Sequence, residues 1–173
     1  MFSLHATKKL LDRVKAPVEP VVSEPTTALG NWYGTVLCWR RQVALLVNEE
    51  TLYPVLMPLA PGATLMERFP GALGGTMGAH GVEGEFIEAE TAEMNEGRYA
   101  RTASRSVLGI MNEFSYLAEA HRASRGELDL VSLALRLSET PCGPLYKRHD
   151  SPDRELLAAV ATWFERQGQR RSR

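Results

Sequence analysis

The chain has 173 residues, of which 44% are hydrophobic and 24% are charged, with 20 Lys+Arg against 21 Asp+Glu. A chain of this length fits one domain and buries roughly 68–70% of its unfolded surface, so its core needs no disulfide or metal. The composition is typical of soluble globular proteins and excludes a wholly disordered or fibrous chain. No apolar run approaches the roughly 20 residues of a membrane span, and the N-terminus lacks the apolar segment of a secretory signal. We therefore expect a cytoplasmic protein that does not associate with membranes.

The positive charge is concentrated at the C-terminal end of the sequence. Residues 166–173 hold four arginines and no acidic residue, which leaves residues 1–165 net acidic. Such tails are usually disordered and solvated, and they can also contact nucleic acid or an acidic partner. We expect a single α+β domain over residues 1–165 and a basic disordered tail over 166–173.

The first part of the chain predicts a strand and a short helix. Residues 2–6 read as a strand, and residues 7–14 as a helix with Thr7 at its N-cap. Residues 16–27 contain three prolines and no helical period, which indicates an extended connector.

The strongest β signal follows this connector. Residues 32–39 and 42–47 are rich in aromatic and β-branched residues, and the two arginines between them fit a tight hairpin loop. Both runs are too apolar for a sheet with one face in water, so we expect both faces to be covered. Residues 51–59 predict a third strand, and its two prolines place it at the edge of the sheet.

The rest of the chain is mainly helical. Two short stretches remain ambiguous or unusual: residues 133–137 also alternate like a strand, and residues 83–96 hold six glutamates and no basic residue, which is typical of a solvated helix face. The order of strands followed by helices favours an α+β fold, in which a small antiparallel sheet of hairpin and edge strand packs against several helices. The predicted elements are helices at 63–73, 85–96, 104–123, 128–138 and from 152 onward, with a short strand at 98–102.

The sequence carries none of the common catalytic or nucleotide-binding motifs. Its four histidines are scattered without the spacing of metal ligands. We therefore predict no metal and no cofactor, and the sequence leaves open whether the protein is an enzyme.

The segment 98–106 is the main candidate for a binding site. It holds three arginines and several hydroxyls just before the long helix, where free N–H groups and the helix dipole favour an anion. A polar stripe continues along one face of this helix and includes Gly109, which costs about 1 kcal/mol in a helix unless something approaches it closely. The alternative is an ordinary solvent face whose arginines pair with acids. The candidate ligand-binding residues are Arg101, Thr102, Ser104, Arg105, Ser106, Asn112 and Tyr116.

The turn after the hairpin supplies a second candidate. Glu49 is a candidate general base if its surroundings raise its pKa, and Asn112 is the other catalytic candidate. The alternative is that Asn48 and Glu49 are ordinary turn residues.

Five segments of the sequence form a pattern that is known from other proteins. They are Thr7-Lys8-Lys9-Leu10-Leu11, Leu29-Gly30-Asn31-Trp32-Tyr33, residues 47–52, residues 101–114 and Glu139-Thr140-Pro141-Cys142. Together they resemble a bacterial domain family of unknown function, number 6933. The resemblance covers residues 2–160, and residues 105–114 are its most specific part. It implies a small bacterial protein and adds weight to Asn48, Glu49 and the stretch 101–112, while the family pattern has lysine at Arg101 and asparagine at Ser104.

Two functions follow as hypotheses. The first is binding of nucleic acid or a phosphorylated small molecule at the start of the long helix. The alternative is a non-catalytic protein–protein interaction module or homodimer that uses the apolar hairpin or the glutamate-rich helix.

Overall fold

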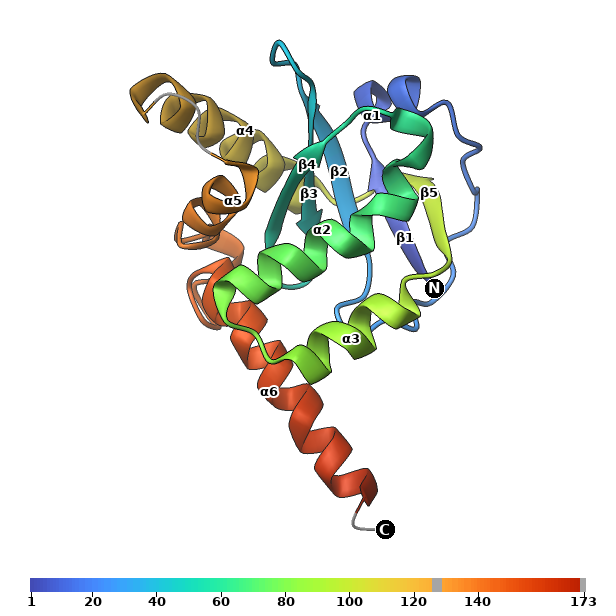
Figure 1. Cartoon of the computed structure of the whole chain (residues 1–173), viewed down its shortest axis with the longest axis vertical. Helices are drawn as coiled ribbons and strands as arrows, with labels where there is room; N and C mark the ends of the chain where they lie inside the picture. Colours follow the sequence, from blue (N-terminus) through green and yellow to red (C-terminus); the bar gives the residue numbers. More distant parts are fainter. Residues whose placement is uncertain (126–128, 172–173) are drawn as a thin grey trace.

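The computed structural model describes residues 1–125 and 129–171, and within them it forms one five-stranded mixed sheet (Figure 1). The strand order is β4-β3-β2-β1-β5. β1 runs parallel to β2 and to β5, while β2–β3 and β3–β4 are antiparallel. The strands are β1 (Phe2–Ala6), β2 (Trp32–Leu37), β3 (Val43–Asn48), β4 (Pro54–Pro58) and β5 (Gly97–Arg101).

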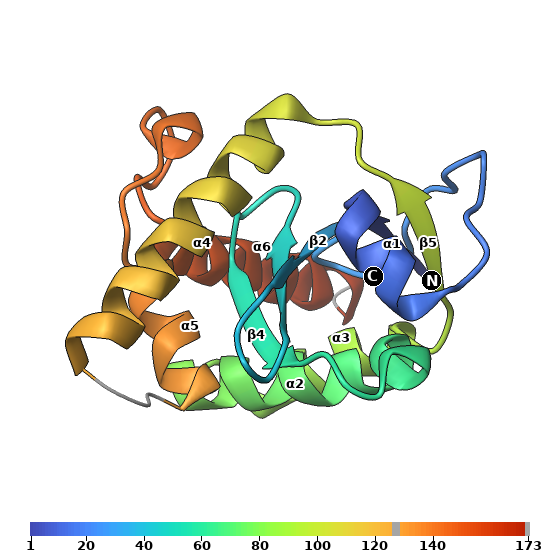
Figure 2. The same ribbon diagram turned by 90° about the horizontal axis from the view of Figure 1, so that it is seen from above.

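Helices cover both faces of this sheet (Figure 2). On one face, α1, α2, α3 and α6 pack against alternate strand residues, and on the other face α4 and α5 do the same. The helices are α1 (Lys8–Val14), α2 (Leu65–His80), α3 (Gly84–Glu93), α4 (Arg105–Arg125), α5 (Leu130–Ser138) and α6 (Pro152–Arg171), with two short 3₁₀ helices, Gly62–Thr64 and Gly143–Leu145.

The α+β class is confirmed, but the prediction of an antiparallel sheet is wrong. The sheet is mixed because β1 and β5 add two parallel pairings to the antiparallel hairpin and edge strand. The hydrophobic pattern of a strand records which residues are buried and not the direction of its neighbours. α1 and the extended connector separate β1 from β2 in the sequence, and β5 lies about ninety residues after β1. Because both pairings join distant segments, the local sequence does not predict either of them.

The hairpin loop is longer than predicted, since β2 ends at Leu37 and β3 begins at Val43, so that residues 38–42 and not the two arginines alone form the loop. The burial of the hairpin and the edge position of the third strand agree with the sequence. Every residue of β3 is buried, and the two faces of β2 and β3 belong to opposite cores. β4 lies at the sheet edge, with prolines at both of its ends. Both predictions are confirmed.

The helices differ from prediction mainly in their length. α2 continues past four glycines to His80, and Gly74 lies against α3, where an added Cβ would be 3.3 Å from Ile87 Cγ2. A glycine therefore allows close packing here and does not end the helix. Residues 130–138, ambiguous in the sequence, form a helix capped by Asp129, whose Oδ1 accepts from Ser132 N at 2.9 Å.

The arginine-rich end of the chain continues α6. Residues 166–171, expected in a disordered tail, form the last turns of this helix, and residues 172–173 lie outside the described part. Figure 1 shows that the C-terminal half of α6 extends away from the body of the protein. Arg171 there forms an ion pair with Glu85 of α3 at 3.1 Å.

Gly34 in β2 gives a test of the core packing. A Cβ at this position would lie 2.7 Å from Leu10 Cδ2 and 3.0 Å from Leu46 Cδ2. We expect Gly34→Ala to lower the free energy of unfolding by about 1–3 kcal/mol through overpacking. Chemical denaturation measures this change, and Gly75→Ala is the control because a Cβ at Gly75 would meet nothing within 4 Å. A Gly34→Ala variant as stable as the native protein would contradict the packing described.

Candidate functional site

The start of α4 is held by groups from the sheet. Ser104 Oγ accepts from Val107 N at 3.3 Å, so Ser104 caps the helix. Ser104 N donates to the Tyr33 hydroxyl at 3.1 Å. The backbone N–H of Ser104 thus fixes the first turn of α4 against β2, while its side chain caps the helix.

Tyr33 joins two of the predicted site residues. Its hydroxyl accepts from Ser104 N and donates to Glu49 Oε1 over 3.5 Å, a long hydrogen bond. Burial raises the Tyr33 pKa above its ordinary value, the Ser104 N–H opposes this, and the Glu49 carboxylate raises it further. The hydroxyl is therefore a neutral hydrogen-bonding group between α4 and the β3–β4 turn.

His5 completes this cluster from the neighbouring strand. It pairs with Tyr33 in register, and the two rings stack with centroids 4.7 Å apart. His5 Nδ1 donates to the Arg101 carbonyl at 2.8 Å, and only 5% of His5 is exposed. The sequence gives no signal for His5 at this site, because its proximity to Tyr33 depends on the parallel pairing of β1 with β2.

The other predicted residues lie on the surface and do not join this cluster. Arg101, Arg105 and Ser106 are exposed, and Thr102 is half-buried. Asn112 and Tyr116 lie further along the exposed face of α4, and Tyr116 is 75% exposed. The space beside Gly109 is open, so no group of the described chain uses the close approach that this glycine allows.

Asn48 is a structural residue of the β3–β4 turn. It is fully buried, and its Nδ2 donates to the carbonyls of Leu29 and Asn31 at 2.8 and 3.2 Å. Its Oδ1 accepts from the backbone N–H groups of Glu50 and Thr51 and from the Thr51 hydroxyl. The turn role that the sequence offered for Asn48 is confirmed.

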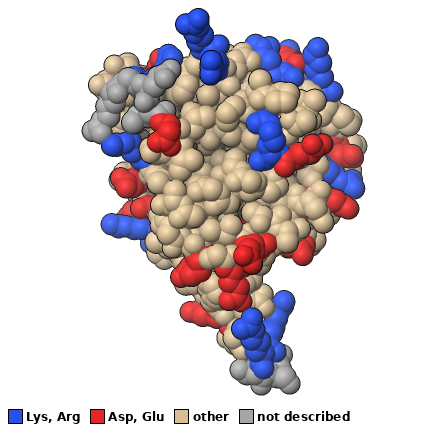
Figure 3. Space-filling model, viewed as in Figure 1, with Lys and Arg blue, Asp and Glu red and all other residues tan. Residues whose placement is uncertain are grey.

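Basic side chains gather at the end of the molecule where β1, β2 and β5 finish. The register of Ala6 with Arg101 brings the ends of β1 and β5 together, and Arg13 Nε of α1 donates to Gln42 Oε1 of the hairpin loop at 3.1 Å. Figure 3 shows Lys and Arg concentrated along this upper end, and another basic group at the tip of α6. We call the following residues the basic end: Lys8, Lys9, Arg13, Lys15, Arg40, Arg41, Arg101 and Arg122.

Most of these cations have no acidic partner among the described residues. Lys8 pairs with Asp12, and Arg122 pairs with Glu119, whereas no ion pair forms at the other six. Because their charges are not neutralised within the described chain, they are available to an anion from outside.

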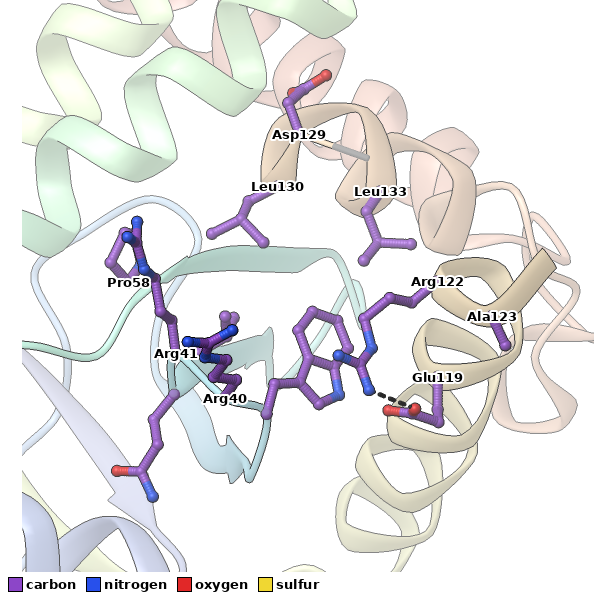
Figure 4. A pocket seen from close by; sticks show the side chains of 12 residues that line it. Arg40, Arg41, Pro58, Glu119, Arg122, Ala123, Asp129, Leu130 and Leu133 are labelled. Atoms are coloured by element: carbon purple, nitrogen blue, oxygen red, sulfur yellow. Dashed lines mark hydrogen bonds and ion pairs between the residues drawn. The ribbon is translucent and has the colours of Figure 1, made fainter. Parts of the chain in front are cut away.

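A cleft opens at this end between the hairpin loop, α4 and α5 (Figure 4). Its volume is about 1340 Å³. Arginines and Trp39 stand beside an apolar floor of Val43, Pro58, Leu130 and Leu133. We call it the Trp39 cleft, and its remaining lining residues are Arg40, Arg41, Gln42, Glu119, Arg122, Ala123 and Asp129.

The acids of the Trp39 cleft are already engaged. Glu119 Oε1 accepts from Arg122 Nη2 at 2.7 Å, and this contact lowers the Glu119 pKa. Asp129 caps α5 and accepts from the Ser132 N–H and hydroxyl, which lowers its pKa. Arg40 and Arg41 remain without an ion pair in the described residues, so the free charge of the cleft is positive. The sequence placed these two arginines only in a turn.

A second groove lies at the opposite end, between α3 and α6, with a volume of about 930 Å³. It contains Glu155, whose side chain is 4% exposed and pairs with Arg148 and with His149 Nδ1, the latter at 2.8 Å. Glu90 also lines it and accepts from the N–H groups of Ala28 and Leu29 at 2.6 and 3.1 Å. All three acids of this groove have partners, since Glu93 accepts from the Thr26 hydroxyl.

Two further findings concern the described residues as a whole. They contain no group of three or more His, Cys, Asp or Glu side chains arranged to hold a metal ion. None of their helices is both long enough and apolar enough to cross a membrane.

The strands of the apolar hairpin are largely covered by the chain itself. Trp32 and Tyr33 are 0% and 1% exposed, and β3 is buried throughout. Of the two surfaces named for a partner protein, the glutamate-rich α3 remains exposed over Glu83, Glu85 and Glu88.

Comparison with known proteins gives one match. The model of a family described as a domain of unknown function (DUF6933) matches residues 3–155. No curated protein and no solved structure matches the chain.

Proposed function

Since the chain belongs to the DUF6933 family, for which no activity can be transferred, we propose from its own geometry that it binds a phosphate-bearing ligand at the basic end. The observation that carries this proposal is the convergence of unpaired cations from three separate segments. Lys9 lies in α1 and Lys15 is the C-cap of this helix, Arg40 and Arg41 lie in the hairpin loop, and Arg101 ends β5.

The start of α4 lies at the other end of this helix from Arg122 and the Trp39 cleft, and in this proposal the exposed face of α4 connects the two. Arg105 and Ser106 open this helix and are exposed, and they follow closely on Arg101. N–H groups of a first helical turn and arginine guanidinium groups both favour phosphate oxygens. Ser104 N is engaged by Tyr33, so the ligand would meet the next N–H groups and the arginines.

The Tyr33–Glu49 pair would not contact the ligand, and its role would be to position the start of α4. Tyr33 and the Glu49 carboxylate hold Ser104, and hence the direction in which α4 begins. In this proposal Glu49 orients the binding surface, and Asn112 and Tyr116 extend it along α4.

The proposal includes a bacterial and cytoplasmic protein. The bacterial source rests on the family resemblance. The cytoplasmic location rests on the two cysteines, which are both free, with Cys38 exposed and Cys142 buried.

Charge removal at matched positions tests the proposed function. We expect Arg40→Ala/Arg41→Ala to weaken binding of inorganic polyphosphate about tenfold at low salt, because two phosphate contacts are lost, and to reduce the salt dependence of binding. Isothermal titration calorimetry measures both. The control is Arg166→Ala/Arg170→Ala on α6, which removes the same charge at the far end. Equal weakening by the two variants, or an effect of the α6 variant alone, would contradict the proposal.

A further inference from the structure

Trp39 is the one aromatic side chain of the hairpin that reaches a ligand-accessible surface in the described structure. Trp32 and Tyr33 are buried in opposite cores, whereas Trp39 is half-exposed and lines the cleft. An aromatic ring placed beside arginines in a cleft has a second use besides packing, because it can stack on a flat ligand group.

The Trp39 ring is held in place by α4. The guanidinium carbon of Arg122 lies 4.8 Å from the ring centroid, in a cation–π contact. Arg122 is in turn bound by Glu119, one turn earlier on α4, and Figure 4 shows this pair at the cleft wall. The ring and the guanidinium plane are thus arranged before any ligand enters, which reduces the entropy lost on binding.

The floor of the cleft is apolar, and its rim is cationic. Leu130 and Leu133 of α5 lie opposite the hairpin loop, and Figure 4 shows Arg40 and Arg41 on the hairpin side. A ligand that fits this arrangement carries a flat, weakly polar group and an anionic group close to each other. A nucleotide with an unpaired base has both.

We propose that the Trp39 cleft binds single-stranded nucleic acid, with an unpaired base against Trp39 and the apolar floor and its phosphates at Arg40 and Arg41. This inference rests on the proposed function and names its ligand class. The positive residues of α1 extend the path for the strand, because Arg13 touches Gln42 at the edge of the same loop. Duplex nucleic acid keeps its bases stacked inside the helix and offers none to Trp39.

The test compares three probes on three proteins. The probes are a fluorescent single-stranded oligouridine of about 12 nucleotides, the same strand paired with its complement, and inorganic polyphosphate. The proteins are the native chain, Trp39→Ala and Trp39→Phe, each checked for native folding by circular dichroism and thermal melting. Anisotropy gives the affinity for the two nucleic acids, and calorimetry gives the affinity for polyphosphate.

We expect the single strand to bind more tightly than the duplex, and Trp39→Ala to weaken single-strand binding by about tenfold. Trp39→Phe keeps a stacking ring, so it should retain most of the native affinity for the single strand. Polyphosphate has no base, so its binding should change little in either variant. A deoxythymidine strand of the same length should bind about as tightly as the oligouridine. In this proposal Trp39 and the arginines contact only the base and the phosphates, which RNA and DNA share.

The outcomes separate this inference from the proposed function. If the duplex binds as tightly as the single strand, or if Trp39→Ala lowers polyphosphate and oligonucleotide binding equally, the stacking site is refuted. If the stacking site is refuted but Arg40→Ala/Arg41→Ala still weakens polyphosphate binding, the proposed anion-binding function stands without the stacking site. Failure of the native protein to bind any of the three probes would overturn both.

Discussion

Asn48→Ala is expected to lower the free energy of unfolding by about 3 kcal/mol. The Asn48 side chain is fully buried and takes part in five hydrogen bonds that join the connector before β2 to the β3–β4 turn. Alanine would leave the carbonyl of Leu29 and the N–H of Thr51 without these partners in a buried site, and each such group costs about 1–3 kcal/mol. Relaxation of the turn and entry of water would keep the total below the sum of these costs.

The other candidate asparagine provides the control for this substitution. Asn112 is exposed on α4, so Asn112→Ala should change stability by less than about 0.5 kcal/mol. Urea denaturation followed by circular dichroism measures both variants. If the two substitutions cost the same, the network around Asn48 does not stabilise the turn in the way described.

Glu90 gives the second large effect, which depends on pH. Burial raises its pKa to about 7, and the N–H groups of Leu29 and Ala28 only partly oppose this. The folded protein therefore binds the Glu90 proton more tightly than the unfolded chain, whose glutamates titrate near pH 4.5. The stabilisation of the folded state by the protonated Glu90 is complete below about pH 4.5, and it is lost as pH rises through about 7. By linkage, Glu90 should contribute a fall of about 3 kcal/mol in the free energy of unfolding across this interval.

Comparison with variants isolates this contribution from other titrating groups. Glu90→Gln cannot ionise, so this variant should become more stable relative to the native protein as pH rises from about 5 to 8. Glu88→Gln on the same helix removes an exposed carboxyl and should leave the pH profile nearly unchanged. Denaturation midpoints across this pH range provide the measurement. Parallel profiles for the native protein and Glu90→Gln would show that Glu90 does not titrate in this interval.

The sequence predicts the local elements of this fold better than their arrangement. The strand at 2–6, the strand that begins at residue 32 and the edge position of β4 follow from aromatic content, periodicity and the placement of prolines, although β2 ends at Leu37 and not at residue 39. The parallel pairings of β1 have no local signal, because they join residues that are distant along the chain. The sequence predicts that this helix ends at residue 73, whereas α2 continues to His80. The contact of Gly74 with α3 is a tertiary property that composition does not reveal.

The candidate site shows the same division. The capping role of Ser104 and the exposed polar face of α4 could be inferred from helical spacing. The link from Ser104 through Tyr33 to Glu49 could not, because it requires the position of α4 across the sheet. The aromatic residues of an apolar hairpin are expected mainly in the core, and only the fold shows that Trp39 lies at a cleft lined by arginines from two elements.

Photo-crosslinking tests the central claim most directly, namely that the basic end is the ligand-binding surface. A single-stranded oligonucleotide that contains 4-thiouridine would be irradiated with the native protein, and the crosslinked peptides identified by mass spectrometry. We predict crosslinks in the hairpin loop, at residues 39–42, with further ones in α1 or at residues 101–106. Crosslinks confined to the arginines of α6, at residues 166–171, would contradict the account, as would a complete absence of crosslinks at the basic end.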